Sequence, residues 1–228
     1  MTMIKARPFD YPYDGKLKPA ATALLVIDLQ VDFLSEQGYF ARQGYDASAL
    51  RAIIPAVRDL IAAARRAGCP IVYTRQGYRA DLADRTPYEQ WRHKHAGLPV
   101  REPSPTGRLL VRGEPGFQII PELTPAPEDI IIDKTANGAF CATDLDHVLR
   151  ARGITHLLFT GCTTDVCVHT TLREANDRNY QCLLVEDGCA SGDAYAHEAA
   201  VYMTTIEGGL FGVVAKAQDV IKGLATLA

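Results

Sequence analysis

A three-layer α/β fold is the fold class that the sequence predicts, with a six-stranded parallel sheet covered by helices on both faces. Two observations lead to it: short apolar runs alternate with segments of helical periodicity, and polar or turn-forming residues bound each run. Runs that are apolar throughout are typical of parallel strands buried on both faces. The 228 residues suffice for one large domain, which we expect to span residues 1–228.

The first part of the chain contains two predicted strands and one helix. Residues 23–27 and 70–74 are the strands, and residues 47–67 form the helix. Residues 75–127 then lose this pattern and are rich in proline, glycine, arginine and aromatic residues. Irregular stretches of this length usually serve a function, so we expect this one to cover a pocket or form an oligomer contact. Within it, His93 and His95 are expected on a loop in solvent.

The alternation resumes in the second part of the chain. Strands are predicted at residues 129–133, 156–160, 182–186 and 210–214. Helices are predicted at residues 143–152, 165–179, 194–206 and 217–227. Strands that alternate with helices in this way form parallel sheets, and ligands of such sheets bind outside the carboxyl ends of the strands.

The composition excludes several functional classes. With 24 lysines and arginines against 27 aspartates and glutamates, the net charge of −3 disfavours binding to nucleic acid. The sequence shows neither a signal peptide nor an apolar run as long as a membrane span, so we expect a cytoplasmic protein without membrane contact. Its six cysteines are then expected as reduced thiols. Without a C-x-x-C pair or a glycine-rich phosphate loop, a zinc ribbon and a dinucleotide enzyme are disfavoured.

Three predicted strands lead into reactive residues, namely Asp28, Lys134 and Cys167. Cys167 falls in the first turn of the following helix, where the helix dipole lowers the pKa of a thiol, and a nearby ammonium group would lower it further. A carboxylate can take the proton of the thiol and later give it to a leaving amine. The three residues together suit the hydrolysis of an amide through a thioester.

Each of these residues also has a purely structural interpretation. Asp28 alone would cap a turn, Lys134 would be a solvated surface residue, and Cys167 would be a small buried side chain. Cys162, in the turn itself, competes with Cys167 as a nucleophile. We favour Cys167 because the start of a helix activates a thiol, and the joint occurrence at three strand ends favours a catalytic site.

The surrounding motifs resemble those of the isochorismatase-like cysteine hydrolases. They are D-L-Q-x-D-F around Asp28, D-K at Lys134 and G-C-T-T-D-V-C-V around Cys167, and the resemblance spans nearly the whole chain. It implies a six-stranded parallel sheet flanked by helices, Asp28 as general base, Lys134 as electrostatic partner and Cys167 as nucleophile. It also implies a cis peptide bond before Thr163 and an oxyanion hole formed by the N–H groups of Thr163 and Cys167.

Within that family, several stretches look most like biuret and triuret hydrolases, which release ammonia from a small, planar ureido compound. They are P-Y-D-G at residues 12–15, G-Y-D at 44–46, Y-R-A-D-L at 78–82, R-G-E-P-G at 112–116, F-C-A-T-D at 140–144 and R-E-A-N-D-R at 173–178. Nicotinamidases usually carry an Asp-x-His metal motif after the second strand, and residues 74–79 lack it. The resemblance therefore implies no metal, no cofactor and a homotetramer.

Six further side chains are candidates for binding the substrate. Asn137 and Glu207 stand where a biuret hydrolase is expected to have lysine and glutamine. As a pocket residue, Glu207 would accept substrate N–H groups and repel an anion, which favours triuret over ureidoacrylate; its alternative role is a cap or an ion pair elsewhere. Aromatic faces could hold a flat ureido group. The remaining candidates are Phe33, Tyr39, Arg75 and Trp91.

We therefore predict a metal-free cysteine amidohydrolase that cleaves a terminal C–N bond of biuret or triuret through a thioester and releases ammonia. The first alternative is hydrolysis of ureidoacrylate or an N-carbamoyl amino acid. An isochorismatase, which cleaves a vinyl ether, would not need the thiol of Cys167. The alternative of another class is an inactive binding module on the same fold, against which the intact set of three reactive residues argues.

Overall fold

The central sheet has six parallel strands within residues 3–227, the part of the chain that the computed structural model describes. The strands are β1 (Thr22–Ile27), β2 (Ile71–Gln76), β5 (Ile130–Lys134), β6 (His156–Cys162), β7 (Gln181–Ala190) and β8 (Val213–Ala215). Their spatial order is β5-β2-β1-β6-β7-β8, so the first strand lies in the middle of the sheet. The six-stranded parallel sheet predicted from the sequence is confirmed.

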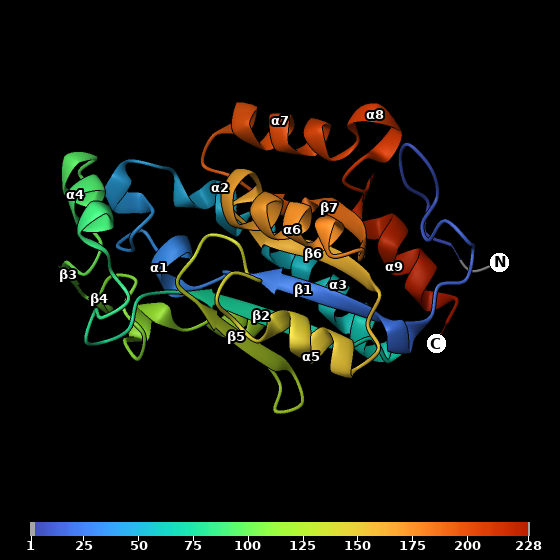
Figure 1. Cartoon of the computed structure of the whole chain (residues 1–228), viewed down its shortest axis with the longest axis horizontal. Helices are drawn as coiled ribbons and strands as arrows, with labels where there is room; N and C mark the ends of the chain where they lie inside the picture. The colour runs from blue at the N-terminus through green and yellow to red at the C-terminus, as the bar shows by residue number, and fades with distance from the viewer. Residues whose placement is uncertain (1–2, 228) are drawn as a thin grey trace.

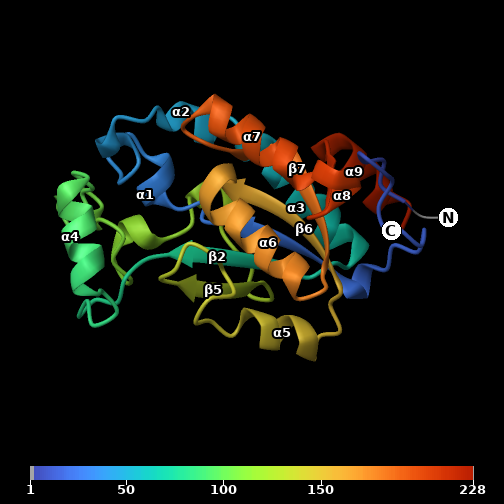
Figure 2. The ribbon, with the colours of Figure 1, turned by 45° about the horizontal axis from the view of Figure 1, so that its top comes forward.

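Helices cover both faces of the sheet, as Figures 1 and 2 show. Among residues 3–227, the α-helices are α1 (Val31–Leu34), α2 (Ala47–Arg51), α3 (Ile54–Ala67), α4 (Pro87–His95), α5 (Leu145–Ala151), α6 (His169–Asp177), α7 (Ala194–Thr204), α8 (Ile206–Gly209) and α9 (Ala217–Ala225). Two short 3-10 helices in the first part of the chain are η1 (Pro19–Ala21) and η2 (Ala41–Gln43). The alternating side chains of β1 define the layers. Leu24 and Val26 point into a core shared with α3 and α9, whereas Leu25 and Ile27 point into a core shared with α5 and α6.

Two predicted helices are divided in the structure. The helix predicted at residues 47–67 is α2 followed by α3, because Pro55 is compatible only with the first turn of a helix. The helix predicted at residues 165–179 begins as a π-helical turn, η5 (Thr164–Val168), and continues as α6. This turn carries Cys167 at the carboxyl end of β6, where the sequence predicts it.

The C-terminal region also differs from its prediction. The helix predicted at residues 194–206 ends within that range as α7, and α8 follows with positive φ angles at Glu207 and Gly208. The backbone is therefore kinked where a continuous helix is expected. The strand predicted at residues 210–214 begins only at Val213, as β8.

The connection between β2 and β5, residues 77–129, is called the covering segment below. It is largely irregular, as predicted, but it contains α4, whose polar residues show no apolar periodicity that would reveal a helix. The signal for α4 is a capping box: Thr86 Oγ1 accepts a hydrogen bond from the N–H of Glu89, and the Glu89 carboxylate accepts one from the N–H of Thr86. Its other regular elements are β3 (Pro103–Ser104), β4 (Gly107–Arg108), η3 (Pro115–Phe117) and η4 (Pro121–Leu123).

The carboxyl ends of the strands point toward the end of the molecule that carries α1 and α4 (Figure 1). The covering segment lies at this same end, so it is placed to close over any site that the strand ends form. Among residues 3–227, no helix combines the length and the apolar character that a membrane crossing requires.

Candidate active site

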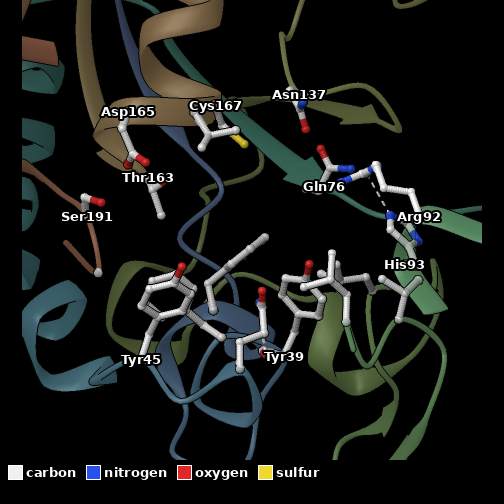
Figure 3. Close-up of a pocket in the computed structure, with 18 of the residues that line it drawn as sticks. Tyr39, Tyr45, Gln76, Arg92, His93, Asn137, Thr163, Asp165, Cys167 and Ser191 are labelled. Atoms are coloured by element: carbon white, nitrogen blue, oxygen red, sulfur yellow. Dashed lines mark hydrogen bonds between the residues drawn. The ribbon is translucent and has the colours of Figure 1, made fainter. Parts of the chain in front are cut away.

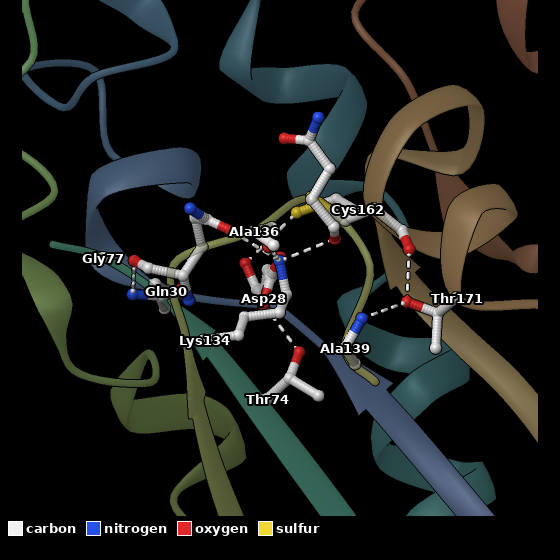
Figure 4. Close-up of polar contacts among 12 residues, drawn as sticks. Asp28, Gln30, Thr74, Gly77, Lys134, Ala136, Ala139, Cys162 and Thr171 are labelled. Carbon is white, nitrogen blue, oxygen red and sulfur yellow. Dashed lines mark hydrogen bonds and ion pairs between the residues drawn. The ribbon is translucent and has the colours of Figure 1, made fainter. Parts of the chain in front are cut away.

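Asp28 and Lys134 form an ion pair at the carboxyl edge of the sheet (Figure 4). Asp28 follows β1, Lys134 ends β5, and the strand between them, β2, contributes Thr74. The Nζ of Lys134 lies 2.7 Å from Oδ2 of Asp28, and Thr74 Oγ1 donates to Oδ1 of Asp28 at 2.6 Å. Both charged side chains are fully buried. Each therefore depends on the other, because an unpaired buried charge is strongly destabilising.

Lys134 makes three further hydrogen bonds. Its Nζ donates to Gln76 Oε1 at 2.6 Å and to the backbone carbonyls of Asn137 at 2.9 Å and Ala136 at 3.2 Å. Burial alone lowers the pKa of Lys134, but the charge of Asp28 and the interactions with Asp28 and Cys167 outweigh burial, and the pKa is raised. Lys134 is therefore a fixed, buried cation and not a solvated surface residue.

The chain passes unusually close to β1 where β6 ends. Gly161 has a φ of +117°, and a Cβ there would collide with the backbone of β1. Cys162 follows, and its Sγ donates to the backbone carbonyl of Asp28 at 3.2 Å. The peptide bond between Cys162 and Thr163 is cis, as the resemblance implies. Cys162 is completely buried and lies outside the cavity lining in residues 3–227, whereas Cys167 is part of it.

Cys167 has a thiol that is not acidic. Burial raises its pKa to about 12; Lys134 lowers the pKa and Asp28 raises it again. The sequence predicts the opposite direction, from the helix dipole and a nearby ammonium group. That prediction is wrong because the desolvation of a buried thiolate, together with the charge of Asp28, outweighs the effect of Lys134. The resting thiol is protonated and needs a base, and the Asp28 carboxylate is close enough to act on its pKa.

A cavity of about 460 Å³ opens at Cys167 (Figure 3). Its volume suits a small molecule. On one side of the thiol lie Thr163, which precedes η5, Asp165 of η5 and Ser191 of the loop before α7, and Asp193 also belongs to the lining. On the other side lie residues of β2, α4 and the loop after β5, namely Gln76, Arg92, His93 and Asn137. Tyr39 and Tyr45 lie across the cavity from the thiol (Figure 3), and the other aromatic residues of the lining are Phe33, Phe40, Tyr78 and Tyr88.

Three of the six predicted substrate-binding residues line this cavity: Phe33, Tyr39 and Asn137. The rings of Phe33 and Tyr39 meet edge to face with centroids 6.0 Å apart, which fixes part of the aromatic wall. Asn137 connects the cavity to the buried ion pair, because its backbone carbonyl accepts from Lys134.

The other three candidates lie outside the cavity lining in the described residues. Arg75 turns away to form an ion pair with Asp133 at 2.7 Å. Trp91 is 60% exposed on the outer face of α4 and stacks on His95. Glu207 is exposed at the kink in α8. The sequence spacing places these side chains near the site but does not determine where they point.

Arg92 and His93 line the cavity and are not found by the sequence reasoning. His93 is buried and not in solvent as predicted: its Nδ1 lies 2.9 Å from Arg85 Nη2, and its Nε2 lies 2.9 Å from Arg92 Nη2. Burial, with these cations, lowers the pKa of His93, so the ring is neutral. Arg92 therefore supplies the positive charge at this end of the cavity. The capping box of α4 is the sequence signal that could have placed both residues on a helix.

Within residues 3–227, no three histidine, cysteine, aspartate or glutamate side chains are arranged to hold a metal ion. All six cysteines, which lie in that range, are free thiols, as predicted. Whether the protein needs a metal or another cofactor stays a matter of prediction.

Known proteins resemble this chain in sequence and in structure. The sequence model of the isochorismatase domain matches residues 22–219. A ureidoacrylate amidohydrolase, RutB of Cronobacter turicensis, is 37% identical over 188 residues, which are 81% of each chain. A cysteine hydrolase structure from Pseudomonas syringae pv. phaseolicola has a TM-score of 0.80 at 25% identity and covers 100% of this chain and 99% of its own. N-carbamoylsarcosine amidase from Thermoplasma acidophilum has a TM-score of 0.66 at 26% identity, with 86% of this chain and 96% of its own covered.

These matches agree with one another. The family match covers both β1, which leads to Asp28, and the segment around Cys167. The structural likeness to the Pseudomonas syringae cysteine hydrolase extends over the whole chain. The chain therefore belongs to the isochorismatase family of hydrolases.

Proposed function

We propose that the chain is a cysteine amidohydrolase that cleaves the C–N bond of a carbamoyl group in a small ureido compound. The observation that carries the proposal is the buried Asp28–Lys134 ion pair beside the thiol of Cys167, in the wall of a small-molecule cavity. Together they supply a base, a cation that holds the base, and a nucleophile. The relatives support this reaction class, since two of them are named as an amidohydrolase and an amidase.

In the proposed reaction Asp28 takes the proton of Cys167 as the sulfur attacks the carbamoyl carbon, because the thiol is neutral at rest. The N–H groups of Thr163 and Cys167 stabilise the oxyanion. The C–N bond breaks, and the departing nitrogen receives the proton from Asp28. Water, activated by the same carboxylate, then cleaves the carbon–sulfur bond and restores the thiol. The carbamic acid that is released decomposes to ammonia and carbon dioxide.

The Arg92 end of the cavity favours a ureido compound that carries a carboxylate, whereas the carboxylates of Asp165 and Asp193 line the other part of the cavity. Glu207 would repel such an anion from within the pocket, but it lies outside the lining. Arg92 contributes a guanidinium group to the lining, and guanidinium groups bind carboxylates with two parallel hydrogen bonds. Ureidoacrylate, which the bacterial relative is named for, has this chemistry. The structure therefore supports the alternative substrate class more strongly than the one favoured by the sequence.

Biuret or triuret remains the second candidate. Asn137 and Ser191 line the cavity with neutral groups that can both donate and accept hydrogen bonds. An uncharged chain of ureido units would bind through such groups and would not need Arg92.

Ammonia release from a panel of five compounds tests the proposal. The panel is ureidoacrylate, N-carbamoylsarcosine, biuret, triuret and nicotinamide, which has an amide but no ureido group. We expect the highest kcat/KM with a ureido acid and no turnover of nicotinamide. In Cys167→Ser the rate should fall on the order of 10³-fold or more, with unchanged thermal unfolding. Wild-type activity in Cys167→Ser would contradict the proposal.

Arg92→Gln separates the two substrate classes. Because it removes a charged partner of the carboxylate, kcat/KM for ureido acids should fall about 10–100-fold. The value for biuret should change little. An equal fall in kcat/KM for both substrates would show that the guanidinium group of Arg92 does not bind the carboxylate of the substrate.

Several expectations from the sequence remain predictions. We expect a strong chelator to leave activity unchanged, because the proposed steps need no metal. Light scattering should give the mass of a homotetramer, and limited proteolysis should show residues 1–228 to be one domain. A cytoplasmic location is likewise expected.

A further inference from the structure

Asp165 is a carboxylate in the cavity wall that has no partner in the described residues. It lies two residues before Cys167, in the first turn of η5. Its Oδ1 is buried and makes no hydrogen bond, and no ion pair within residues 3–227 includes Asp165. Buried acceptors without a donor are rare and destabilising, because they lose water and gain nothing in return.

A helix-capping role does not account for Asp165. An acid near the start of a helix usually accepts hydrogen bonds from the N–H groups of the first turn, but no such bond to Asp165 is present in the part of the chain that the structure describes. Asp193, which also lines the cavity, shows the usual arrangement. Its Oδ1 accepts from the N–H of Tyr195 at 2.8 Å and from that of Ala196 at 3.2 Å, as the N-cap of α7. The carboxylate of Asp193 thus accepts hydrogen bonds from its own helix, whereas that of Asp165 accepts none from the described residues.

The two histidines near Asp165 do not neutralise it. Burial lowers the pKa of His169 to about 4 and the pKa of His197 below its usual range, and the charge of Asp165 only partly opposes this. Both rings are therefore neutral at pH 7. The ring of His197 is already bonded to Thr164 Oγ1 at 2.8 Å. Asp165 therefore lines the cavity as a carboxylate without a donor from the described residues, to which a molecule in the cavity could donate.

We propose that Asp165 binds the amino group of the carbamoyl that Cys167 attacks, and so selects substrates whose carbamoyl nitrogen carries two hydrogens. The inference rests on the proposed function. Figure 3 shows Asp165 on one side of Cys167, with Thr163 and Ser191, and Arg92 on the other side. The cavity thus offers an acceptor to the N–H end of a ureido acid and a cation to its carboxylate end. A substrate held at both ends has its carbamoyl carbon at the thiol.

This orientation also determines which nitrogen departs. With the –NH2 group bound to Asp165, the nitrogen that bears the acid chain lies toward Arg92, so its bond to the carbamoyl carbon is the one that breaks. The new bond joins that carbon to the sulfur of Cys167, and the proton of the thiol passes through Asp28 to the departing amine. Water then releases the carbamoyl group from the sulfur as carbamic acid.

Two substrates and three variants test the inference. The substrates are an N-carbamoyl acid with a free –NH2 group and its N,N-dimethylcarbamoyl analogue, which has no hydrogen to donate at that nitrogen. Asp165→Asn keeps the shape and removes the charge, and Asp165→Ser replaces the carboxylate with a single hydroxyl on a shorter side chain and opens space. The matched control is Asp46→Asn: Asp46 is an N-cap outside the cavity lining, bonded to the N–H of Ser48 at 2.8 Å, and asparagine caps a helix equally well. Thermal unfolding of each variant shows whether it folds.

In Asp165→Asn, KM for the –NH2 substrate should rise about 10-fold with kcat nearly unchanged, since a charge-assisted hydrogen bond becomes a neutral one. In Asp165→Ser, the preference in kcat/KM for –NH2 over –N(CH3)2 should fall about 10-fold or more. Asp46→Asn should keep the wild-type values. A merely structural role of Asp165 would instead lower kcat for both substrates alike and leave the preference unchanged.

An unchanged preference in folded Asp165→Ser, or the same loss of preference in Asp46→Asn, would overturn the inference and leave the proposed function intact. The wild-type protein gives a measurement that does not depend on the folding of any variant: equal turnover of the two substrates would overturn the inference as well. If the wild-type protein released ammonia from no ureido compound, the proposed function would fail, and the inference with it.

Discussion

The carboxyl edge of the sheet and the covering segment line the same site, but they are built differently. At the sheet edge, Asp28, Thr74 and Lys134 are fully buried, come from adjacent strands and contact one another at 2.6–2.7 Å. In the covering segment, Arg92 is exposed on a helix of nine residues that a capping box at Thr86 begins. The core of the molecule holds the first region, whereas a few local bonds hold the second.

This difference teaches that the reaction and the choice of substrate can be separated. Groups that exchange protons benefit from a rigid scaffold, because small displacements cost rate. A binding group on an irregular connection can change without disturbing that scaffold. We expect substitutions at the sheet edge to change kcat and stability together, and substitutions in the covering segment to change mainly KM.

The largest effect should come from Lys134→Met. The change leaves Asp28 buried without its partner, so the free energy of unfolding should fall by about 3–5 kcal/mol, and kcat should fall by about 10²-fold or more. Urea unfolding and steady-state kinetics measure the two losses. Lys216→Met is the matched control: it also removes an ion pair, at 2.8 Å to Glu186, but Lys216 is 58% exposed. In Lys216→Met the free energy of unfolding should fall by less than about 1 kcal/mol. Equal losses of stability in the two variants would contradict the idea that burial makes the Asp28–Lys134 pair the more important one.

Asp32 connects the two regions, and its contribution to stability should depend on pH. It is buried in α1, and its Oδ2 accepts a hydrogen bond at 2.7 Å from the N–H of Leu110 in the covering segment. Burial raises the pKa of Asp32 from 3.8 to about 6. Since folding favours the protonated form, the contribution is fully present below about pH 4 and is lost as the pH rises through 6.

Asp32→Asn does not titrate and therefore isolates this effect. The free energy of unfolding of the wild-type protein, relative to that of Asp32→Asn, should fall by about 2–3 kcal/mol between pH 4 and pH 7. Urea unfolding at several pH values measures the difference. A difference that stays constant over this range would mean that Asp32 titrates alike in the folded and unfolded chains.

The smallest effect should come from Thr86→Ala. Loss of the N-cap weakens α4 by about 1 kcal/mol, so KM for a ureido acid should rise by a factor of about 2–5, with kcat unchanged. Steady-state kinetics with that substrate measure both constants. Glu89→Gln keeps the capping box and should resemble the wild-type protein. A fall in kcat with constant KM would contradict the prediction, because it would mean that α4 affects the rate of the reaction, as the sheet edge is expected to do, and not the binding of the substrate.

Most of the fold could be predicted from the sequence, because buried parallel strands are apolar along their whole length. The run at residues 23–27 is β1 almost residue for residue, and Asp28 marks its carboxyl end. The ends of helices were harder to place, since one residue such as Pro55 can divide a segment whose periodicity is continuous. No apolar stripe reveals α4, because its residues are mostly polar.

The candidate site could be predicted only in part. Asp28 and Lys134 lie together because the strand order brings the ends of β1, β2 and β5 to one place. The raised pKa of Cys167 could not be predicted, because it depends on how completely the surrounding residues exclude water. The sequence predicts Glu207 in the cavity lining and gives no sign of Arg92, but the structure places Arg92 in the lining and Glu207 outside it. The reason is that side-chain direction depends on where the chain kinks and where a helix starts.

β1 lies between β2 and β6, and β6 begins only at His156. While the ribosome makes the chain, β1 can pair with β2 early, but its other edge stays open until β6 has emerged. An open apolar edge invites wrong partners, and pairing across so long a separation is slow. The partners Asp28 and Lys134 are both made before Cys167, so the proposed nucleophile arrives last. The proposed nucleophile therefore follows directly on the strand that closes the open edge of β1.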